Sequence, residues 1–418
     1  MKVAACVRLA IAVLLLALGA GAAWAQPFEI TIRGNQAHMT AMLPFIEEFN
    51  ASQERIRVVY QPGGEEIEAI TAAYLAGQLP DMIESAGVFN HAYAPQGWMA
   101  SLEPFVAREG PDFMQDIFPA TIDSHNRVNG VLYSIPIFLQ IEGMYYNPEV
   151  FDRAAVAPPQ PGWTWEDMRA LSQRIRQYGP SGEITTWGLV ARHPAQFDNV
   201  LIMQAGGVFV TRDYEVVVDS EPVRTAYTFI LDMIDQDLLH YIRGIHSRAP
   251  SEEGRAHHTG LVSDATYRQH TWNELGSALR TAPPLRYQAG WEPVTAMSDR
   301  SLAIMNVAPE RQEAAWEFIR WMMRPENLSR YTASLGYPPA TRSAAQHPYF
   351  QEYALNNPNV LLWAEMYGSI KTMQIQPHGL PGITAMQEAL LRGQITLAQF
   401  LEDATAFLTA RVRELRDN

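Results

Sequence analysis

Side chains able to bind a polar solute lie at the ends of two predicted strands. Gln36 and His38 follow the alternating apolar segment 28–32, and Glu84 and Ser85 come at the end of another segment, 79–84. Amide, imidazole, carboxyl and hydroxyl groups pair with the hydroxyls of a sugar or polyol as donors and acceptors. Each group also has a plainer interpretation. Gln36 and His38 could cap a helix, and Glu84 and Ser85 could serve in an ordinary loop.

Catalytic chemistry has weaker support. The sequence has no Gly-x-Ser-x-Gly, no His-Glu-x-x-His and no glycine-rich phosphate loop with a lysine. Asp81 and Glu84 could form the carboxylate pair of a secreted carbohydrate-active hydrolase, which stays an alternative. The side chains of His257 and His258 diverge on a strand or a helix, so they rarely chelate one ion. We predict a binding protein rather than an enzyme, with no metal and no cofactor.

The first 25 residues have the pattern of a secretory signal peptide. Lys2 and Arg8 are basic, an apolar run follows, and Ala23-Trp24-Ala25 is a typical cleavage pattern. The apolar run is too short to span a bilayer, which takes about 20 residues. Cys6 is the only cysteine and precedes the apolar run, so we expect no lipid anchor. The predicted location is the periplasm.

The net charge of the chain argues against anionic partners and ligands. The 418 residues carry a net charge of −14, and loss of Lys2 and Arg8 makes the exported chain still more acidic. Such a field repels nucleic acids and anionic membranes. It also disfavours an anionic ligand, although a local positive pocket could form from Arg33, Arg192, Arg300 and Lys371. We expect a neutral sugar or oligosaccharide.

The elements that must position these groups follow a repeated plan. Alternating residues predict strands at 28–32 and 56–60, and helical spacing predicts helices over 39–49 and 67–77. A third strand follows at 79–84. Strand–helix alternation is typical of a parallel sheet with helices on its faces, where ligands bind beyond the carboxyl ends of the strands.

Several later segments resemble the extracellular solute-binding proteins of ABC importers, in the large sugar-binding class. The blocks that carry the resemblance, in order, are Gly130-x-x-Tyr133-x-x-Pro136, Met144-Tyr145-Tyr146-Asn147, Trp163-Thr164-Trp165-Glu166, Gly254-Arg255-Ala256, Trp321 to Asn327 and Gly336-Tyr337-Pro338-Pro339. The tail, through Pro381 and the last helix, is most similar to the glycerol-3-phosphate and glycerophosphodiester binders. Together the blocks cover nearly the whole exported chain.

The resemblance implies an α/β fold of two lobes joined by a hinge, the periplasmic-binding-protein or Venus-flytrap fold. It places residues 26–137 and 287–335 in the first lobe and residues 138–286 and 336–418 in the second. It implies a monomer that binds a small solute between the lobes and delivers it to the transmembrane subunits of an ABC permease. By resemblance or by position, the expected ligand-binding residues are Gln36, His38, Glu84, Ser85, Gln140, Arg192, His193, Gln196, Ser263, Arg300, Tyr337 and Gln376.

The chain also departs from the family pattern. His257-His258 stands where a methionine is usual, and Ser298-Asp299-Arg300 replaces an expected glycine pair. Gln376 takes the place of the arginine that holds phosphate in the glycerol-phosphate binders. That exchange removes a bidentate phosphate donor, so the resemblance leaves a phosphorylated ligand in doubt.

Overall fold

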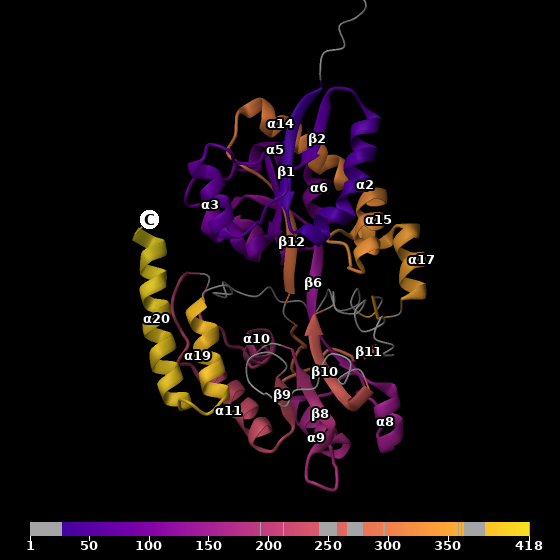
Figure 1. Ribbon diagram of the computed structural model, residues 1–418, viewed down its shortest axis with the longest axis vertical. Helices are drawn as coiled ribbons and strands as arrows, with labels where there is room; N and C mark the ends of the chain where they lie inside the picture. The colour runs from indigo at the N-terminus through magenta and orange to yellow at the C-terminus, as the bar shows by residue number, and fades with distance from the viewer. Residues whose placement is uncertain are drawn as a thin grey trace, which may run out of the picture.

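A computed structural model describes residues 27–417 except 193, 212, 242–256, 266–278, 296, 358, 361 and 363–380. The segment predicted to be a signal peptide and the predicted site residues His193 and Gln376 lie outside the described residues. The chain forms two lobes, one above the other in Figure 1, with strands β6 and β12 between them. We call the lobe that contains the first strand the N-lobe and the other the C-lobe.

The N-lobe begins with the predicted strand–helix repeat. Its elements are β1 (Phe28–Gly34), α2 (Gln36–Ser52), β2 (Ile56–Tyr60), α3 (Ile67–Leu75) and β3 (Met82–Ala86). Strand β1 pairs in parallel with β2 and β3, so the predicted parallel sheet is confirmed. The apolar residues of α2 face the sheet because they recur at helical spacing, and Met39, Met42 and Ile46 are buried with Ile30 and Ile32.

Two expected loops are shorter than predicted. Asn35 caps α2 by accepting hydrogen bonds from the backbone N–H groups of Ala37 and His38, so Gln36 and His38 lie in the first helical turn. Glu84 and Ser85 lie within β3, which continues to Ala86. The predicted strand ends before β3 does because the polar residues Glu84 and Ser85 end the apolar pattern while the backbone pairing continues.

Short elements complete the N-lobe after β3. They are η1 (Gly87–Phe89), α4 (Asn90–Tyr93), α5 (Glu103–Glu109), α6 (Pro111–Asp116), α7 (Pro119–Thr121), η2 (Ile122–Asn126), β4 (Arg127–Val128) and β5 (Val131–Leu132).

Two long strands connect the lobes. Strand β6 (Ser134–Tyr146) pairs with β12 (Met297–Ile304) over its first half and with β10 over its second half. The resulting sheet has the order β2-β1-β3-β12-β6-β10-β8-β7. The first half of β6 therefore lies in the N-lobe and the second half in the C-lobe (Figure 1).

The C-lobe repeats the layered plan. Its elements are α8 (Pro148–Ala154), α9 (Trp165–Ile175), β7 (Gln177–Tyr178), β8 (Ile184–Ala191), α10 (Pro194–Gln204), α11 (Glu221–Asp235), β9 (Leu239–Tyr241), β10 (Thr259–Ala265), β11 (Arg280–Thr281), α19 (Pro381–Leu391) and α20 (Leu397–Asp417). Helix α9 starts with the predicted capping box of Thr164 and Asp167. The last two helices pack against α10 and α11, where Phe400 and Leu401 join the core around Trp165.

Between β12 and α19 the described residues form four helices. They are α14 (Pro309–Met322), α15 (Pro325–Leu335), α16 (Arg342–Gln346) and α17 (Pro348–Asn356). Trp316, Phe318 and Tyr331 pack in the N-lobe core with α2. Tyr337 and Ala344 are in the same core, and Phe350 lies in a smaller cluster with Leu139 and Val262. The domain boundaries given above stay a prediction.

Candidate functional site

The carboxyl ends of the parallel strands in both lobes point at the middle of β6. Strand β3 runs in the direction of β6 and ends at Ala86, level with Phe138 through β12. Strand β10 runs against β6 and ends at Ala265, opposite Glu142. The two sets of strand ends thus approach each other from opposite sides, four residues apart on β6, or about 13 Å in extended chain. This junction is the expected place for a ligand in such sheets.

One face of β6 runs through the whole junction. Side chains alternate along a strand, so Phe138, Gln140, Glu142 and Met144 project from the same face. Phe138 lies in the N-lobe core and Met144 in the C-lobe core. Gln140 and Glu142, between them, are half-buried. We call these four residues the β6 face.

The N-lobe end of the β6 face is aromatic. The rings of Tyr337 and Phe138 are stacked, with centroids 4.4 Å apart, and the ring of His38 meets that of Phe138 edge-on at 5.1 Å. Gln140 Nε2 donates a hydrogen bond to the Tyr337 hydroxyl over 3.3 Å. Tyr337 reaches this place because α15 ends at Gly336, whose φ of 76° turns the chain back toward β6.

A buried ion-pair network supports this aromatic cluster. Arg300 donates to both carboxylate oxygens of Glu84, at 2.7 and 2.9 Å, and to Glu65 Oε2 at 2.5 Å. Glu84 has no exposed surface. Its Oε1 also lies 3.2 Å from His38 Nδ1, and its Oε2 accepts the backbone N–H of Asn35. The carboxylate therefore joins β3, β12 and the start of α2.

The pKa values of the two carboxyl groups in the network are shifted in opposite directions. Burial alone raises the pKa of Glu84, but the Arg300 charge and the hydrogen bonds from His38 and Arg300 outweigh it and bring the pKa to about 2. For Glu65, burial outweighs Arg300 and raises the pKa. Because Glu84 is an anion, it requires a proton on His38 Nδ1, which leaves Nε2 as the only ring nitrogen available to another group.

Gly34 makes the close approach possible. A Cβ at this position lies 2.8 Å from the Glu84 backbone oxygen and from its Oε2. Any larger residue separates the end of β1 from β3 and displaces Glu84.

Ser85 faces the other side of the sheet from Glu84, as successive strand residues do. Its partner in the register, Ser301, bonds to Asn126 and Asp299 on that opposite side. Ser85 is buried and its hydroxyl has no hydrogen bond among the described residues. It does not lie on the β6 face.

The C-lobe end of the junction carries Ser263, Arg192 and Gln196. Ser263 lies opposite Met144 in the strand register and on the same side of the sheet. Arg192 follows β8, and its Nη1 lies 3.7 Å from Asp264 Oδ1. Gln196 is half-buried on α10. Of the four basic residues considered for a positive pocket, Arg300 and Arg192 are paired with carboxylates, and Lys371 is outside the described residues. Arg33, nine-tenths buried, has no ion-pair partner in the described part of the chain.

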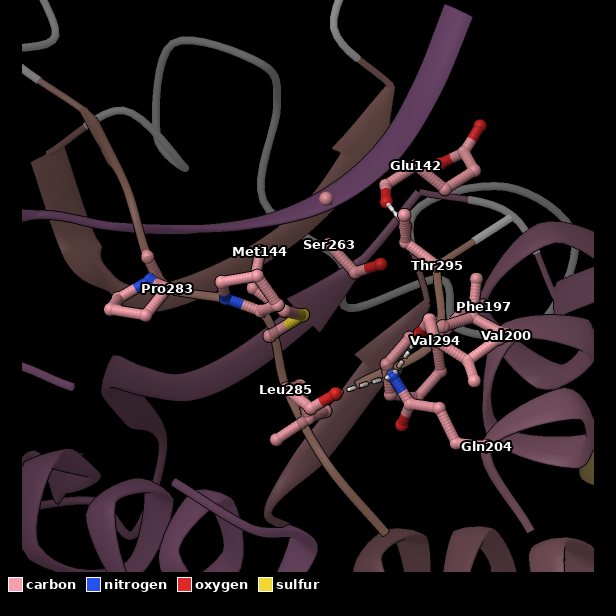
Figure 2. Close-up of a pocket in the computed structure, with 13 residues that line it drawn as sticks. Glu142, Met144, Phe197, Val200, Gln204, Ser263, Pro283, Leu285, Val294 and Thr295 are labelled. Atoms are coloured by element: carbon pink, nitrogen blue, oxygen red, sulfur yellow. Dashed lines mark hydrogen bonds between the residues drawn. The ribbon is translucent and has the colours of Figure 1, made fainter. Parts of the chain in front are cut away.

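A small pocket opens beside Glu142 on this side, and Figure 2 shows it with Met144, Phe197, Val200, Leu285 and Val294 as its apolar walls. Ser263 is its polar wall from β10. Burial and the neighbouring Asp264 raise the pKa of Glu142 to about 8, although Arg192 opposes the shift. Glu142 is thus mostly uncharged at pH 7.

The structure therefore divides the predicted site residues into groups. It brings together His38, Glu84, Gln140, Arg300 and Tyr337, and it places Ser263 and Arg192 across the junction from them. Gln36 is exposed in the first turn of α2. Phe138, Glu142 and Met144 are not among the predicted residues, although the alternation from Gln140 points to them. Glu65 carries no signal in the sequence.

The chain belongs to the family described as bacterial extracellular solute-binding protein, whose model matches residues 45–358. The family resemblance is thus confirmed. No helix among the described residues is long and apolar enough to cross a membrane. The same residues contain no cluster of three or more His, Cys, Asp or Glu that could hold a metal ion.

Similar proteins include two kinds of binder. The chain is 23% identical over 369 residues to the sn-glycerol-3-phosphate-binding periplasmic protein UgpB of Pectobacterium atrosepticum, covering 85% of this chain and 81% of that one. Among solved structures, the cyclic alpha-maltosyl-1,6-maltose binding protein of Arthrobacter globiformis superposes with a TM-score of 0.76 at 19% identity, over 94% of this chain and all of the other. UgpB of Mycobacterium tuberculosis in complex with glycerophosphocholine gives 0.74 at 15% identity, over 94% and 98%. These similarities confirm the two-lobed α/β fold.

Proposed function

We propose that this protein is the substrate-binding component of an ABC importer. It captures a sugar, an oligosaccharide or a sugar-like polyol derivative between its lobes and delivers it to the permease. It is exported by a cleaved signal peptide, works in the periplasm as a monomer without a lipid anchor, and is not an enzyme. The family assignment and the names of the similar proteins support this proposal.

The β6 face is the observation that carries the proposal. It joins hydrogen-bonding groups of both lobes, Tyr337 and Gln140 on one side and Glu142 and Ser263 on the other. The buried stack of Tyr337 on Phe138 beside them holds the Tyr337 hydroxyl in place. A solute that contacts both ends of this face stabilises the closed arrangement of the lobes by population shift.

His38 is the residue of the ion-pair network best placed to contact the solute. Glu84 and Arg300 are buried and bonded to each other, whereas the imidazole Nε2 of His38 has no hydrogen bond among the described residues. We therefore assign Glu84 and Arg300 to positioning and His38 Nε2, Gln140 and Tyr337 to direct hydrogen bonds with ligand hydroxyls. Ser263 and Glu142 contact the ligand from the C-lobe.

The carboxylates named for a hydrolase do not fit that role. Asp81 and Glu84 lie three residues apart on an extended chain, about 10 Å, and on opposite faces of the sheet. Asp81 pairs with Arg311 and accepts from Thr31 N at 2.7 Å, while Glu84 pairs with Arg300. A glycosidase needs two carboxyl groups aimed at one bond at a separation of about 5 to 9.5 Å. The geometry favours binding over hydrolysis.

The test is a ligand panel with a thermal readout. We expect at least one neutral sugar, oligosaccharide or glycerophosphodiester to raise the melting temperature, since a ligand at 100 times its Kd adds about 2.7 kcal/mol to stability. Gln140→Ala should weaken binding about tenfold, which corresponds to loss of a well-placed hydrogen bond. Gln399→Ala, an exposed glutamine on α20, is the matched control. No response to any member of the panel contradicts the proposal.

A further inference from the structure

The pocket beside Glu142 is small and almost entirely apolar. It offers about 20 Å³, slightly more than the 10–15 Å³ that one water molecule needs. Its walls come from β6, α10 and the segment 282–295, and they include the side chains of Met144, Phe197, Val200, Leu285 and Val294 (Figure 2). The space accommodates one group of about the size of a methyl.

Most polar groups around the pocket are already bonded. The Gln204 amide donates to the carbonyl oxygens of Leu285 and Val294, at 3.0 and 2.8 Å, and accepts from Trp165 Nε1 at 2.7 Å. The Thr295 hydroxyl donates to the carbonyl of Glu142. These bonds fix the segment 285–295 against α10, so the pocket is a preformed part of the C-lobe rather than a gap between loose loops.

Two polar side chains at its edge are unbonded within the described chain, the Ser263 hydroxyl and the Glu142 carboxyl. Glu142 is mostly protonated at pH 7, because burial and Asp264 raise its pKa to about 8. The nearest charged pair, Arg192 and Asp264, is internally compensated. A phosphate placed in the pocket finds no cationic side chain among its lining residues and loses its hydration, so the pocket disfavours phosphate groups.

We propose that this pocket is a subsite for a methyl-sized, uncharged substituent of the bound solute, such as the methyl group of a deoxy sugar or of a methyl glycoside. The proposal rests on the proposed function and specifies the ligand within it. Ser263 and Glu142 then bond to the ring oxygens next to the methyl group, while the remaining hydroxyls face Gln140 and Tyr337. The β6 face thereby binds a polar end of the solute in the N-lobe and an apolar end in the C-lobe.

The experiment compares sugars in which a methyl group replaces either a hydroxymethyl group or the hydrogen of a hydroxyl group. Calorimetric titrations use D-fucose against D-galactose, L-rhamnose against L-mannose, and methyl glycosides against the free sugars. We expect the methyl-bearing member of at least one pair to bind about tenfold tighter, because the pocket either gains a buried methyl group or avoids an unpaired hydroxyl. A ratio within about twofold for every pair that binds overturns the subsite but leaves the solute-binding function intact.

Variants of the pocket wall test whether the preference for methyl-bearing sugars arises in the pocket. Val200→Ile adds one carbon to the pocket wall and should reduce the preference for the methyl sugar to about one, with little change for the parent sugar. Val59→Ile, the same change at a half-buried valine on β2 at the outer edge of the N-lobe sheet, is the matched control. An unchanged preference in Val200→Ile overturns the subsite.

A second variant covers the case in which Val200→Ile folds poorly. Val294→Ala enlarges the pocket and should shift the preference from methyl to ethyl glycosides, and an unshifted preference contradicts the assignment. If no member of the ligand panel binds to the wild-type protein, the proposed function fails. If only a glycerophosphodiester binds, the proposed function stands and the methyl subsite fails.

Discussion

The two ends of the β6 face differ in the ionisation state of their carboxyl groups. Both hold a carboxyl group at the junction of the lobes, fully buried in Glu84 and half-buried in Glu142. At the N-lobe end, Glu84 stays ionised because Arg300 and His38 bind it. At the C-lobe end, Glu142 has no ion pair among the described residues, and burial and Asp264 favour its protonated form. The comparison shows that a binding site can be made rigid by ion pairs in one half and electrically neutral in the other, with one strand carrying both.

The largest expected effect breaks the ion-pair network. Glu84→Gln removes the charge that satisfies Arg300, and loss of one partner from a buried pair costs about 3–5 kcal/mol of unfolding free energy. Urea denaturation measures it. Glu317→Gln, whose ion pair with Arg55 is exposed, should cost less than about 1 kcal/mol. Equal losses in the two variants would show that the buried network is no more important than a surface pair.

The loss of unfolding free energy in Glu84→Gln should also depend on pH. The native pKa of Glu84 is about 2, below its ordinary value of 4.5, so its contribution is present above pH 4.5 and is lost as the pH falls toward 2. The stability difference between the wild type and Glu84→Gln should therefore be constant from pH 7 to pH 5 and shrink below that. A difference that does not change with acidification contradicts the assigned pKa.

Gly34 tests the packing behind the network. Gly34→Ala brings a Cβ within 2.8 Å of Glu84 and should cost about 1–3 kcal/mol, the usual range for overpacking. Gly143→Ala, which adds the same group in open space on β6, should be neutral or slightly stabilising. Urea melts of the two variants provide the comparison, and a neutral Gly34→Ala would mean that the start of α2 moves freely.

Glu142 gives the opposite pH behaviour. Its native pKa of about 8 lies above 4.5, so the folded protein keeps a proton that the unfolded chain releases. The contribution of Glu142 to stability is full below pH 4.5 and is lost as the pH rises to 8. Glu142→Gln removes this loss, so the variant should gain melting temperature relative to the wild type at pH 8.5 but not at pH 4.5. A gain that is equal at both pH values points to packing instead of ionisation.

The smallest effect concerns Tyr337. Tyr337→Phe keeps the ring stacked on Phe138 and removes only the hydroxyl that accepts from Gln140 at 3.3 Å. The expected loss of stability is about 0.5–1.5 kcal/mol, the net value of one hydrogen bond. A loss as large as that of Glu84→Gln would mean that the aromatic cluster, and not the ion pairs, holds the N-lobe end together.

Much of the architecture was predictable because it depends on local patterns. Alternation gave β1 and β2, helical spacing gave α2 and α3, and the capping box at Thr164 gave the start of α9. His38, Glu84, Gln140 and Tyr337 were all named in advance, and they do gather at one place. The pattern does not show that Ser85 faces the other side of the sheet from the β6 face, because alternation ends the strand at residue 84, two residues before β3 ends.

The sequence by itself determined the α/β class, the family and the strand ends where polar groups gather, since these depend on periodicity and on ordered short motifs. Only the tertiary structure decided which carboxyl group is charged. Glu65, Glu84 and Arg300 are far apart in the chain, and Glu142 is an unremarkable residue of an apolar strand. Their ionisation depends on burial and on the nearest partner in space, and neither is written in any local segment of the chain.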